Sequence, residues 1–234
     1  SLLLDCSGDT LGGSGTVSAD TITGFGMAGA IRYERIENLG IGLGSGNNSL
    51  YIEGTAAGTF TSITGSSGDD IFNMSSDMAS GTGTLDDIRG GLLIDGGGGF
   101  NTLNVNDRGN TSGRGTALSN AIITESSITG MTGDAAGCGT ISYSAETGFA
   151  GGINIFNGSG SDYLTVESAL SGAATVISSG AGNDFITARS GLNNDGLLAI
   201  LGEAGADYVN AAGWRSGLVA IGDASIEQAC KNGN

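Results

Sequence analysis

The chain has 234 residues, of which 46 are glycine and none is proline. Collagen and polyproline structures need proline-rich segments, and a disordered chain is unlike one that is 38% hydrophobic and only 14% charged. The net charge of −16 disfavours binding to nucleic acid and to anionic membrane surfaces, and it suits solubility or the capture of cations. The longest apolar run is Leu197–Leu201, far short of the roughly 20 residues that span a bilayer, so no transmembrane segment is predicted.

One pattern recurs six times along the chain: a glycine-rich turn ending in Asp or Asn, followed by alternating apolar residues. The copies are GSGNNSLYI (44–52), GSSGDDIFNM (65–74), GGGGFNTLNV (96–105), GSGSDYLTV (158–166), GAGNDFITA (180–188) and GEAGADYVNA (202–211). The glycine two places before the Asp or Asn returns after 22 or 23 residues in Gly46–Gly68 and in the series Gly160, Gly182, Gly205. The sequence therefore predicts coils, meaning single windings of the chain, of about 22 residues.

A longer repeat lies above this one. Ile22 matches Ile128, Tyr33 matches Tyr143 and Gly46 matches Gly160, at offsets of 106, 110 and 114 residues. We predict a single domain over 1–234 that is internally duplicated, with copies at about 12–107 and 108–213 and partial copies at both ends. Such a chain is expected to be a segment of a longer array.

The residues after each turn predict β-strands, because their apolar side chains alternate with a period of two. A coil of about 22 residues cannot bury these side chains alone, whereas stacked coils share a core and satisfy each other's backbone groups. We therefore expect an all-β fold, a right-handed parallel β-helix or β-solenoid. The side chains expected to point inward are Leu50, Ile52, Phe72, Met74, Leu103, Val105, Leu164, Val166, Ile186, Ala188, Val209 and Ala211.

The turns G-S-G-S-D-x-L at 158–164 and G-x-G-N-D-x-I at 180–186 resemble the glycine-rich, calcium-binding nonapeptide repeats of the RTX family, and 65–72 is similar. In that family the turns stack and hold Ca²⁺ between coils, in secreted toxins, adhesins, surface-layer proteins and carbohydrate-modifying enzymes. This chain has one such turn per coil instead of two, and Asn48 and Asn101 replace the acid. The resemblance implies that Ca²⁺ is bound by the side chains of Asp70, Asp162, Asp184 and Asp207 and by the carbonyls of Gly68, Gly160, Gly182 and Gly205.

The residues also indicate a cation without the family. In a stack, Asp162, Asp184 and Asp207 would lie about 4.8 Å apart, where their charges repel by a few kcal/mol. Oxygen ligands without any histidine favour Ca²⁺ over softer metals. The alternative is a ladder in which Asn and Asp side chains simply cap their own turns, with no ion.

Three aromatic residues follow the turn acid in the second copy: Tyr163, Phe185 and Tyr208. They are expected to form an outward stripe, which either stacks on itself or contacts a neighbouring chain. Their first-copy counterparts are Ser49, Ile71 and Thr102.

The cysteines Cys6, Cys138 and Cys230 are too far apart in a straight stack for Cys6 and Cys230 to pair within one chain. They are expected to be either buried thiols or links between successive subunits in an oxidising compartment.

No catalytic constellation emerges, because the chain lacks histidine and has only Lys231 as a lysine. We expect a non-enzymatic structural module, extracellular or at the cell surface, that Ca²⁺ stabilises. It would assemble end to end or laterally into a filament, surface layer or adhesin stalk. The alternatives are a carbohydrate- or ice-binding module and a polysaccharide-active β-helix enzyme. The residues that hint at a binding face are Asn73, Asn104, Thr165, Thr187 and Asn210.

Overall fold

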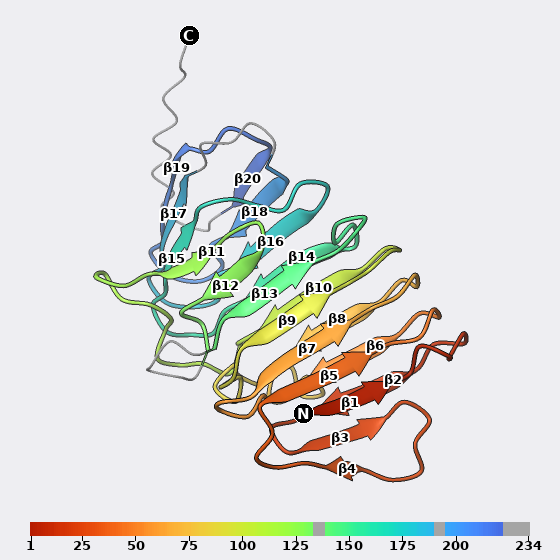
Figure 1. The fold of residues 1–234 in the computed structure, drawn as a ribbon. Helices are drawn as coiled ribbons and strands as arrows, with labels where there is room; N and C mark the ends of the chain where they lie inside the picture. Colours follow the sequence, from red (N-terminus) through yellow and green to blue (C-terminus); the bar gives the residue numbers. More distant parts are fainter. Residues whose placement is uncertain (133–138, 190–194, 222–234) are drawn as a thin grey trace.

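The computed structural model describes residues 1–132, 139–189 and 195–221. Every regular element in this part of the chain is a β-strand, so the all-β prediction is confirmed. The strands form two ten-stranded sheets (Figure 1). In spatial order, sheet A contains β1 (Leu2–Asp5), β5 (Asn38–Gly42), β7 (Phe60–Thr64), β9 (Leu92–Asp95), β13 (Ile141–Ser144), β12 (Ser127–Thr129), β11 (Ala121–Ile123), β15 (Tyr163–Val166), β17 (Phe185–Arg189) and β19 (Tyr208–Gly213). Sheet B contains β4 (Ile31–Arg32), β3 (Thr21–Gly24), β2 (Ser14–Val17), β6 (Ser49–Ile52), β8 (Ile71–Met74), β10 (Thr102–Asn106), β14 (Gly152–Phe156), β16 (Ala174–Ser178), β18 (Leu197–Leu201) and β20 (Leu218–Ile221).

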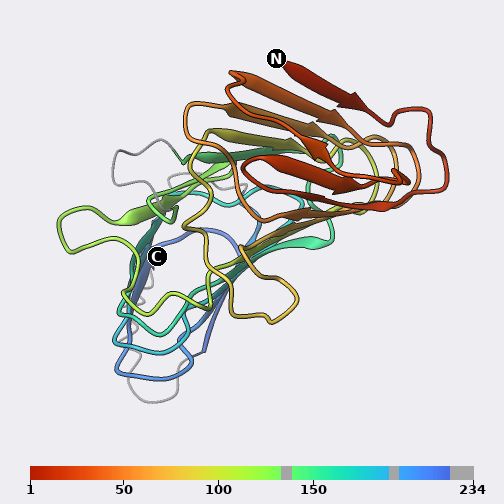
Figure 2. The same cartoon turned by 90° about the horizontal axis from the view of Figure 1, so that it is seen from below.

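Most neighbouring strands are parallel, and the chain advances along both sheets from one end of the molecule to the other (Figures 1 and 2). Ser49 on β6 lies opposite Ile71 on β8, and Tyr163 on β15 lies opposite Phe185 on β17. In both pairs the separation along the chain equals the shorter spacing of the turn glycines. A longer connection increases the separation between Ile71 and its partner Thr102 on β10. The repeat length predicted from the turn glycines is therefore the separation in sequence between paired residues of several adjacent strands.

Two groups of antiparallel strands differ from the all-parallel arrangement that the sequence predicts. β3 pairs with β2 and β4, and β12 pairs with β11 and β13, in each case antiparallel. An antiparallel strand needs only a short reversal, so these segments add strands without a complete coil. Their registers correspond, because Val17 opposite Ile22 in the first group matches Ile123 opposite Ile128 in the second, at the offset between the two predicted copies.

The two predicted copies enter the sheets in opposite order. The glycine-rich turns of the first copy lead from sheet A to sheet B, as from β7 to β8, whereas those of the second lead from sheet B to sheet A, as from β16 to β17. The parallel strands of sheet A all run in the same direction, so the first set of turns follows their carboxyl ends and the second set precedes their amino ends. The two sets of turns therefore lie at opposite ends of the strands.

The core consists of the inward side chains of both sheets, which form one hydrophobic cluster. All the predicted inward side chains are buried except Ala211, which is partly buried against the cluster. The rings of Phe72 and Tyr143 each pack edge-on against Phe149, with centroid distances of 6.2 and 6.0 Å. The described part of the chain contains no helix of the length and hydrophobicity needed to cross a lipid bilayer.

Candidate functional site

The glycines of successive glycine-rich turns lie directly against one another. A Cβ atom on Gly68 would come within 2.3 Å of the Gly46 carbonyl oxygen, and one on Gly99 within 2.3 Å of the Gly68 oxygen. In the second copy a Cβ on Gly205, whose φ is +138°, would come within 1.6 Å of the Gly182 oxygen. Glycine is required at these positions because the stacking of the turns leaves no room for a side chain.

Each Asp or Asn that ends a turn also binds the preceding glycine-rich turn. The Asn48 N–H donates to Asp70 Oδ1 at 2.8 Å, and the Asp70 N–H donates to Asn101 Oδ1 at 2.9 Å. We call this series the first turn column, which consists of Asn48, Asp70 and Asn101.

The second copy forms the same ladder from three acids, at the opposite ends of the strands. The Asp162 N–H donates to Asp184 Oδ1 at 2.8 Å, and the Asp184 N–H donates to Asp207 Oδ1 at 3.0 Å. We call this series the second turn column, which consists of Asp162, Asp184 and Asp207. Three of the four predicted acids are thus brought together, while Asp70 lies between two asparagines in the other column.

In the first turn column the asparagine amides satisfy their own turns. Asn48 Nδ2 donates to the carbonyls of Gly44 and Gly46 at 3.0 and 2.6 Å. Asn101 Nδ2 donates to the Gly96 and Gly98 carbonyls at 2.9 and 3.0 Å. An asparagine at this position therefore uses its oxygen for the ladder and its nitrogen mainly for the turn, although Asn48 Nδ2 also donates to Asp70 Oδ1 at 3.0 Å. This is the capping arrangement that the sequence left open as the alternative to an ion.

The acids place a second carboxylate oxygen where asparagine has its amide nitrogen. Asp70 Oδ2 and Asn101 Nδ2 lie at matching places, 2.8 and 3.0 Å from where a Cβ on Gly65 and Gly96 would stand. The Oδ2 atoms of Asp70, Asp162 and Asp184 are buried and have no hydrogen bond of good geometry, although Asn157 lies close enough to Asp162, and Ser179 to Asp184, to lower their pKa. A buried acceptor without a donor favours the protonated acid or a bound cation.

Burial accordingly raises the pKa of these carboxyl groups. It raises the pKa of Asp162 to about 6, against the lowering effect of the Arg114 N–H, and the charge of Asp184 raises it further. Burial also raises the pKa of Asp184, although the Ser179 hydroxyl and the Asp162 N–H lower it. The pKa of Asp70 is raised by burial as well, against hydrogen bonds from Asn48.

The second turn column has more polar surroundings than the first. Asn157 and Ser179 lie near it, where the corresponding positions of the first copy are Leu43 and Gly65. Both polar atoms of the Asn157 amide are buried without a hydrogen bond. Among the described residues, however, no three His, Cys, Asp or Glu side chains are close enough to hold a metal ion together. The carbonyls of Gly68, Gly160 and Gly182 lie against the glycine of the following turn. The assignment of these carbonyls and of the four acids as calcium ligands stays a prediction.

Sequence reasoning missed Arg114, which binds the first residue of the second turn column. The Arg114 N–H donates to Asp162 Oδ1, and Arg114 Nη2 binds Asp107 Oδ1 at 2.7 Å and Asp86 Oδ1 at 2.9 Å. Asp107 is fully buried, and its carboxylate pairs with this guanidinium. The arginines share no repeat position, and for that reason no pattern singled out Arg114.

The three predicted aromatic residues form a stack on sheet A, which we call the aromatic strip: Tyr163, Phe185 and Tyr208. The centroids of Tyr163 and Phe185 are 6.1 Å apart, and those of Phe185 and Tyr208 are 4.6 Å apart with an interplanar angle of 12°. The rings stack on one another, as expected of a self-stacking ladder, and the Phe185 ring remains 39% exposed. A contact with a neighbouring chain stays a proposal.

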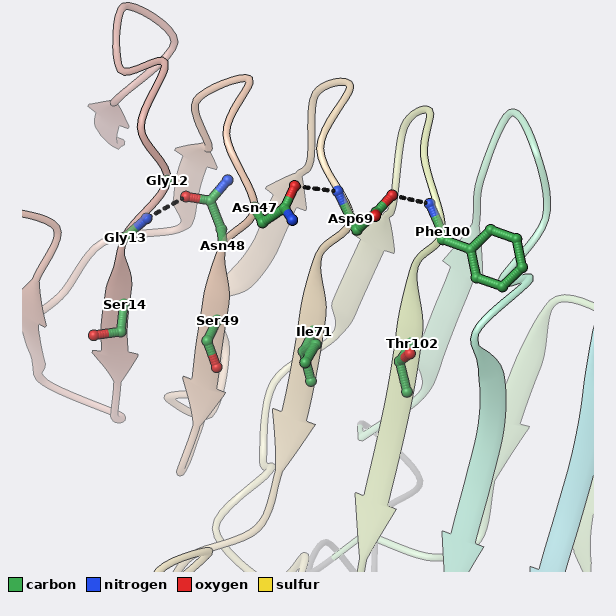
Figure 3. Close-up of a pocket in the computed structure, with 10 residues that line it drawn as sticks. All are labelled: Gly12, Gly13, Ser14, Asn47, Asn48, Ser49, Asp69, Ile71, Phe100 and Thr102. Atoms are coloured by element: carbon green, nitrogen blue, oxygen red, sulfur yellow. Dashed lines mark hydrogen bonds between the residues drawn. The ribbon is translucent and has the colours of Figure 1, made fainter.

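The corresponding face of the first copy is hollow. A groove of about 560 Å³ lies over β2, β6, β8 and β10, with Ser49, Ile71 and Thr102 on its floor (Figure 3). Turn residues form its rim: the Asp69 N–H donates to Asn47 Oδ1 at 3.0 Å, and the Phe100 N–H donates to Asp69 Oδ1 at 2.7 Å. We call this feature the outer groove. Sequence reasoning predicted that these floor residues point outward but did not predict a cavity.

Cys6 is a free, partly buried thiol, and burial raises its pKa. Cys138 and Cys230 lie outside the described residues, so the expected states of these cysteines stay predictions.

No family model matches the chain, and comparison with curated proteins and with solved structures found no similar protein. The likeness of the turns to RTX repeats therefore rests on the motifs alone.

Proposed function

We propose that the chain is a structural module: a right-handed β-solenoid with coils of about 22 residues, belonging to an extracellular or cell-surface filament, surface layer or adhesin stalk. The observation that carries the proposal is the stacking of the turns. Gly68 packs directly against Gly46, and the Asp or Asn side chain at the end of each turn binds the preceding turn. The stability of such a stack is a sum of terms between neighbouring coils, so further coils can be added at either end.

The ends of the sheets support assembly with further copies. Leu3 on the edge strand β1 is 71% exposed, and Ile221 on the edge strand β20 is 59% exposed. Sheet edges carry unpaired backbone groups, and exposed apolar side chains there favour pairing with another chain. Head-to-tail contact, with β1 and β4 at one end of the molecule meeting β19 and β20 at the other, would extend both sheets into a homo-polymer.

Calcium in the second turn column would stabilise the module. Asp162 Oδ2, Asp184 Oδ2 and the Asn157 amide oxygen are buried oxygen atoms without hydrogen-bond donors, and such hard oxygen atoms suit Ca²⁺. The ion would supply positive charge between stacked carboxylates. Its binding would add to the free energy of unfolding, since only the folded chain brings these oxygens together.

The test is circular dichroism, thermal unfolding and sedimentation of the whole chain in CaCl₂ and in EGTA. We expect EGTA to lower the unfolding temperature and to shift the protein to smaller species. The variant Asp184→Asn should lose the calcium effect, whereas Asp87→Asn, which changes an exposed acid, should keep it. Identical unfolding temperature and size in both solutions would remove calcium from the proposal, and a monomer at every concentration would remove the polymer.

A further inference from the structure

We propose that the outer groove of the first copy binds a linear, uncharged saccharide, with about one sugar ring per strand. This goes beyond the structural role, and it depends neither on calcium nor on assembly. It starts from a difference between the two copies on equivalent strands.

The strands under the outer groove and under the aromatic strip have equivalent registers. Ser49, Ile71 and Thr102 lie opposite one another on adjacent parallel strands. Their counterparts Tyr163, Phe185 and Tyr208 do the same in the second copy. The second copy fills its outer face with stacked rings, whereas the first has a hydroxyl, an isoleucine and a hydroxyl there and remains hollow. The hollow therefore follows from the side chains.

Unused hydrogen-bonding atoms surround the groove. Asn47 and Asp69 each spend one oxygen on the next turn, which leaves Asn47 Nδ2 as a free donor and Asp69 Oδ2 as a free acceptor. The hydroxyls of Ser49 and Thr102 on the floor make no hydrogen bond. Amide, carboxylate and hydroxyl groups that converge on a groove of this size, within the common range of about 300–1,000 Å³, are typical of a site for a polar ligand.

An exposed ring completes the chemistry of a sugar site. Phe100 stands at one end of the groove with 64% of its surface exposed, and its ring points outward, away from the other lining residues (Figure 3). Aromatic faces pack well against the C–H faces of pyranose rings, while the hydroxyls of the sugar bind polar neighbours. A second hollow of about 440 Å³, lined by Tyr51, Glu53 and Asn73, lies on the neighbouring positions of β6 and β8 and extends the same face.

Charge and spacing select the class of saccharide. The net charge of −16 and the carboxylate of Asp69 at the rim disfavour sulfated or uronic acid chains. The four strands under the groove are spaced by about 4.8 Å, close to the advance of one β-linked pyranose unit. A neutral β-linked chain lying across the strands would thus place each ring over one strand.

The test is titration calorimetry of the whole chain with cellohexaose, chitohexaose, xylohexaose, laminarihexaose and a heparin hexasaccharide. We expect at least one neutral hexamer to bind and heparin not to bind. Phe100→Ala should weaken binding about tenfold by removing the stacking ring, a loss of about 1.4 kcal/mol. Ser49→Tyr should abolish binding, because it puts into the groove the ring that the second copy carries at Tyr163. The matched control Tyr163→Ser should bind as the unmodified protein does.

Circular dichroism establishes that each variant is folded. The proposal is overturned if no neutral hexamer binds at about 1 mM, if heparin binds best, or if folded Ser49→Tyr binds as tightly as the unmodified chain. It is also overturned if Ser49→Tyr changes only the sedimentation of the protein, which would make the groove a contact between copies.

Discussion

At the scale of single residues, Asn and Asp at the same turn position differ in one atom, with opposite hydrogen-bonding roles. Asn48 points an amide nitrogen at its own turn carbonyls, whereas Asp162 has a buried oxygen there that finds no donor. A buried acceptor without a partner costs about 1–3 kcal/mol. The second turn column therefore gives up stability at neutral pH unless a proton or a cation neutralises it.

Asp162 should make the protein more stable in mild acid when calcium is absent. Its pKa is raised to about 6 in the folded chain, above the value of about 4 for an exposed carboxyl, so the folded state binds the proton more tightly. The stability gained is fully present below about pH 4 and is lost as the pH rises through about 6. In EGTA we expect the urea midpoint to fall between about pH 4 and pH 6, and to fall less in Asp162→Asn.

The control for this experiment is Asp87→Asn, which alters a half-exposed acid paired with Arg89. It should show the same pH dependence as the unmodified chain. An equal fall in the urea midpoint for both variants would mean that Asp162 is not the titrating group.

At the scale of elements, the apolar alternation was enough to predict which side chains of the strands face the core. Residues such as Leu50 and Ile52 are fully buried because a strand with a period of two can hide only one face. The direction of pairing was not predictable in the same way. Thr21–Gly24 reads as an ordinary strand, but its short connection to β2 makes it pair antiparallel. The connection, and not the strand, sets the direction.

The turns should tolerate no side chain at the stacked glycines. Gly68→Ala brings a methyl group within 2.3 Å of the Gly46 carbonyl, so we expect it to lower the free energy of unfolding by about 1–3 kcal/mol in chemical denaturation. Gly29→Ala is the matched control, because nothing lies within 4 Å of its new methyl group. If both variants unfold at the same denaturant concentration, the turns are not held in the stacked contact described above.

At the scale of the whole molecule, the edge strands determine what the chain can join. Leu3→Lys places a charge on the exposed edge strand β1, and we expect it to reduce any concentration-dependent association measured by sedimentation velocity. Leu118→Lys changes a fully exposed leucine in the connection between β10 and β11 and should leave association unchanged. Equal effects of the two lysines would indicate non-specific repulsion between chains and would argue against edge pairing.

The sequence was informative about the turns and much less so about the outer surface. Repetition marked the acids of the second turn column, since equivalent residues recur at equal intervals. It did not mark the outer groove, because a cavity arises where side chains are small and leaves no motif. Repetition also could not place the two turn columns at opposite ends of the strands, since the same strand pattern fits the inner face of either sheet.

That placement has a mechanical consequence. The first turn column is held mainly by asparagine amides and the second by three carboxylates, so a change in pH or in cation concentration acts more strongly on the second, over the C-terminal half. Weakening the second turn column would loosen the contacts between the later strands on that side, while the earlier strands would stay bound. If Ca²⁺ binds in the second turn column as proposed, its removal would bend the molecule toward that side, with the junction of β10 and β14 as the hinge.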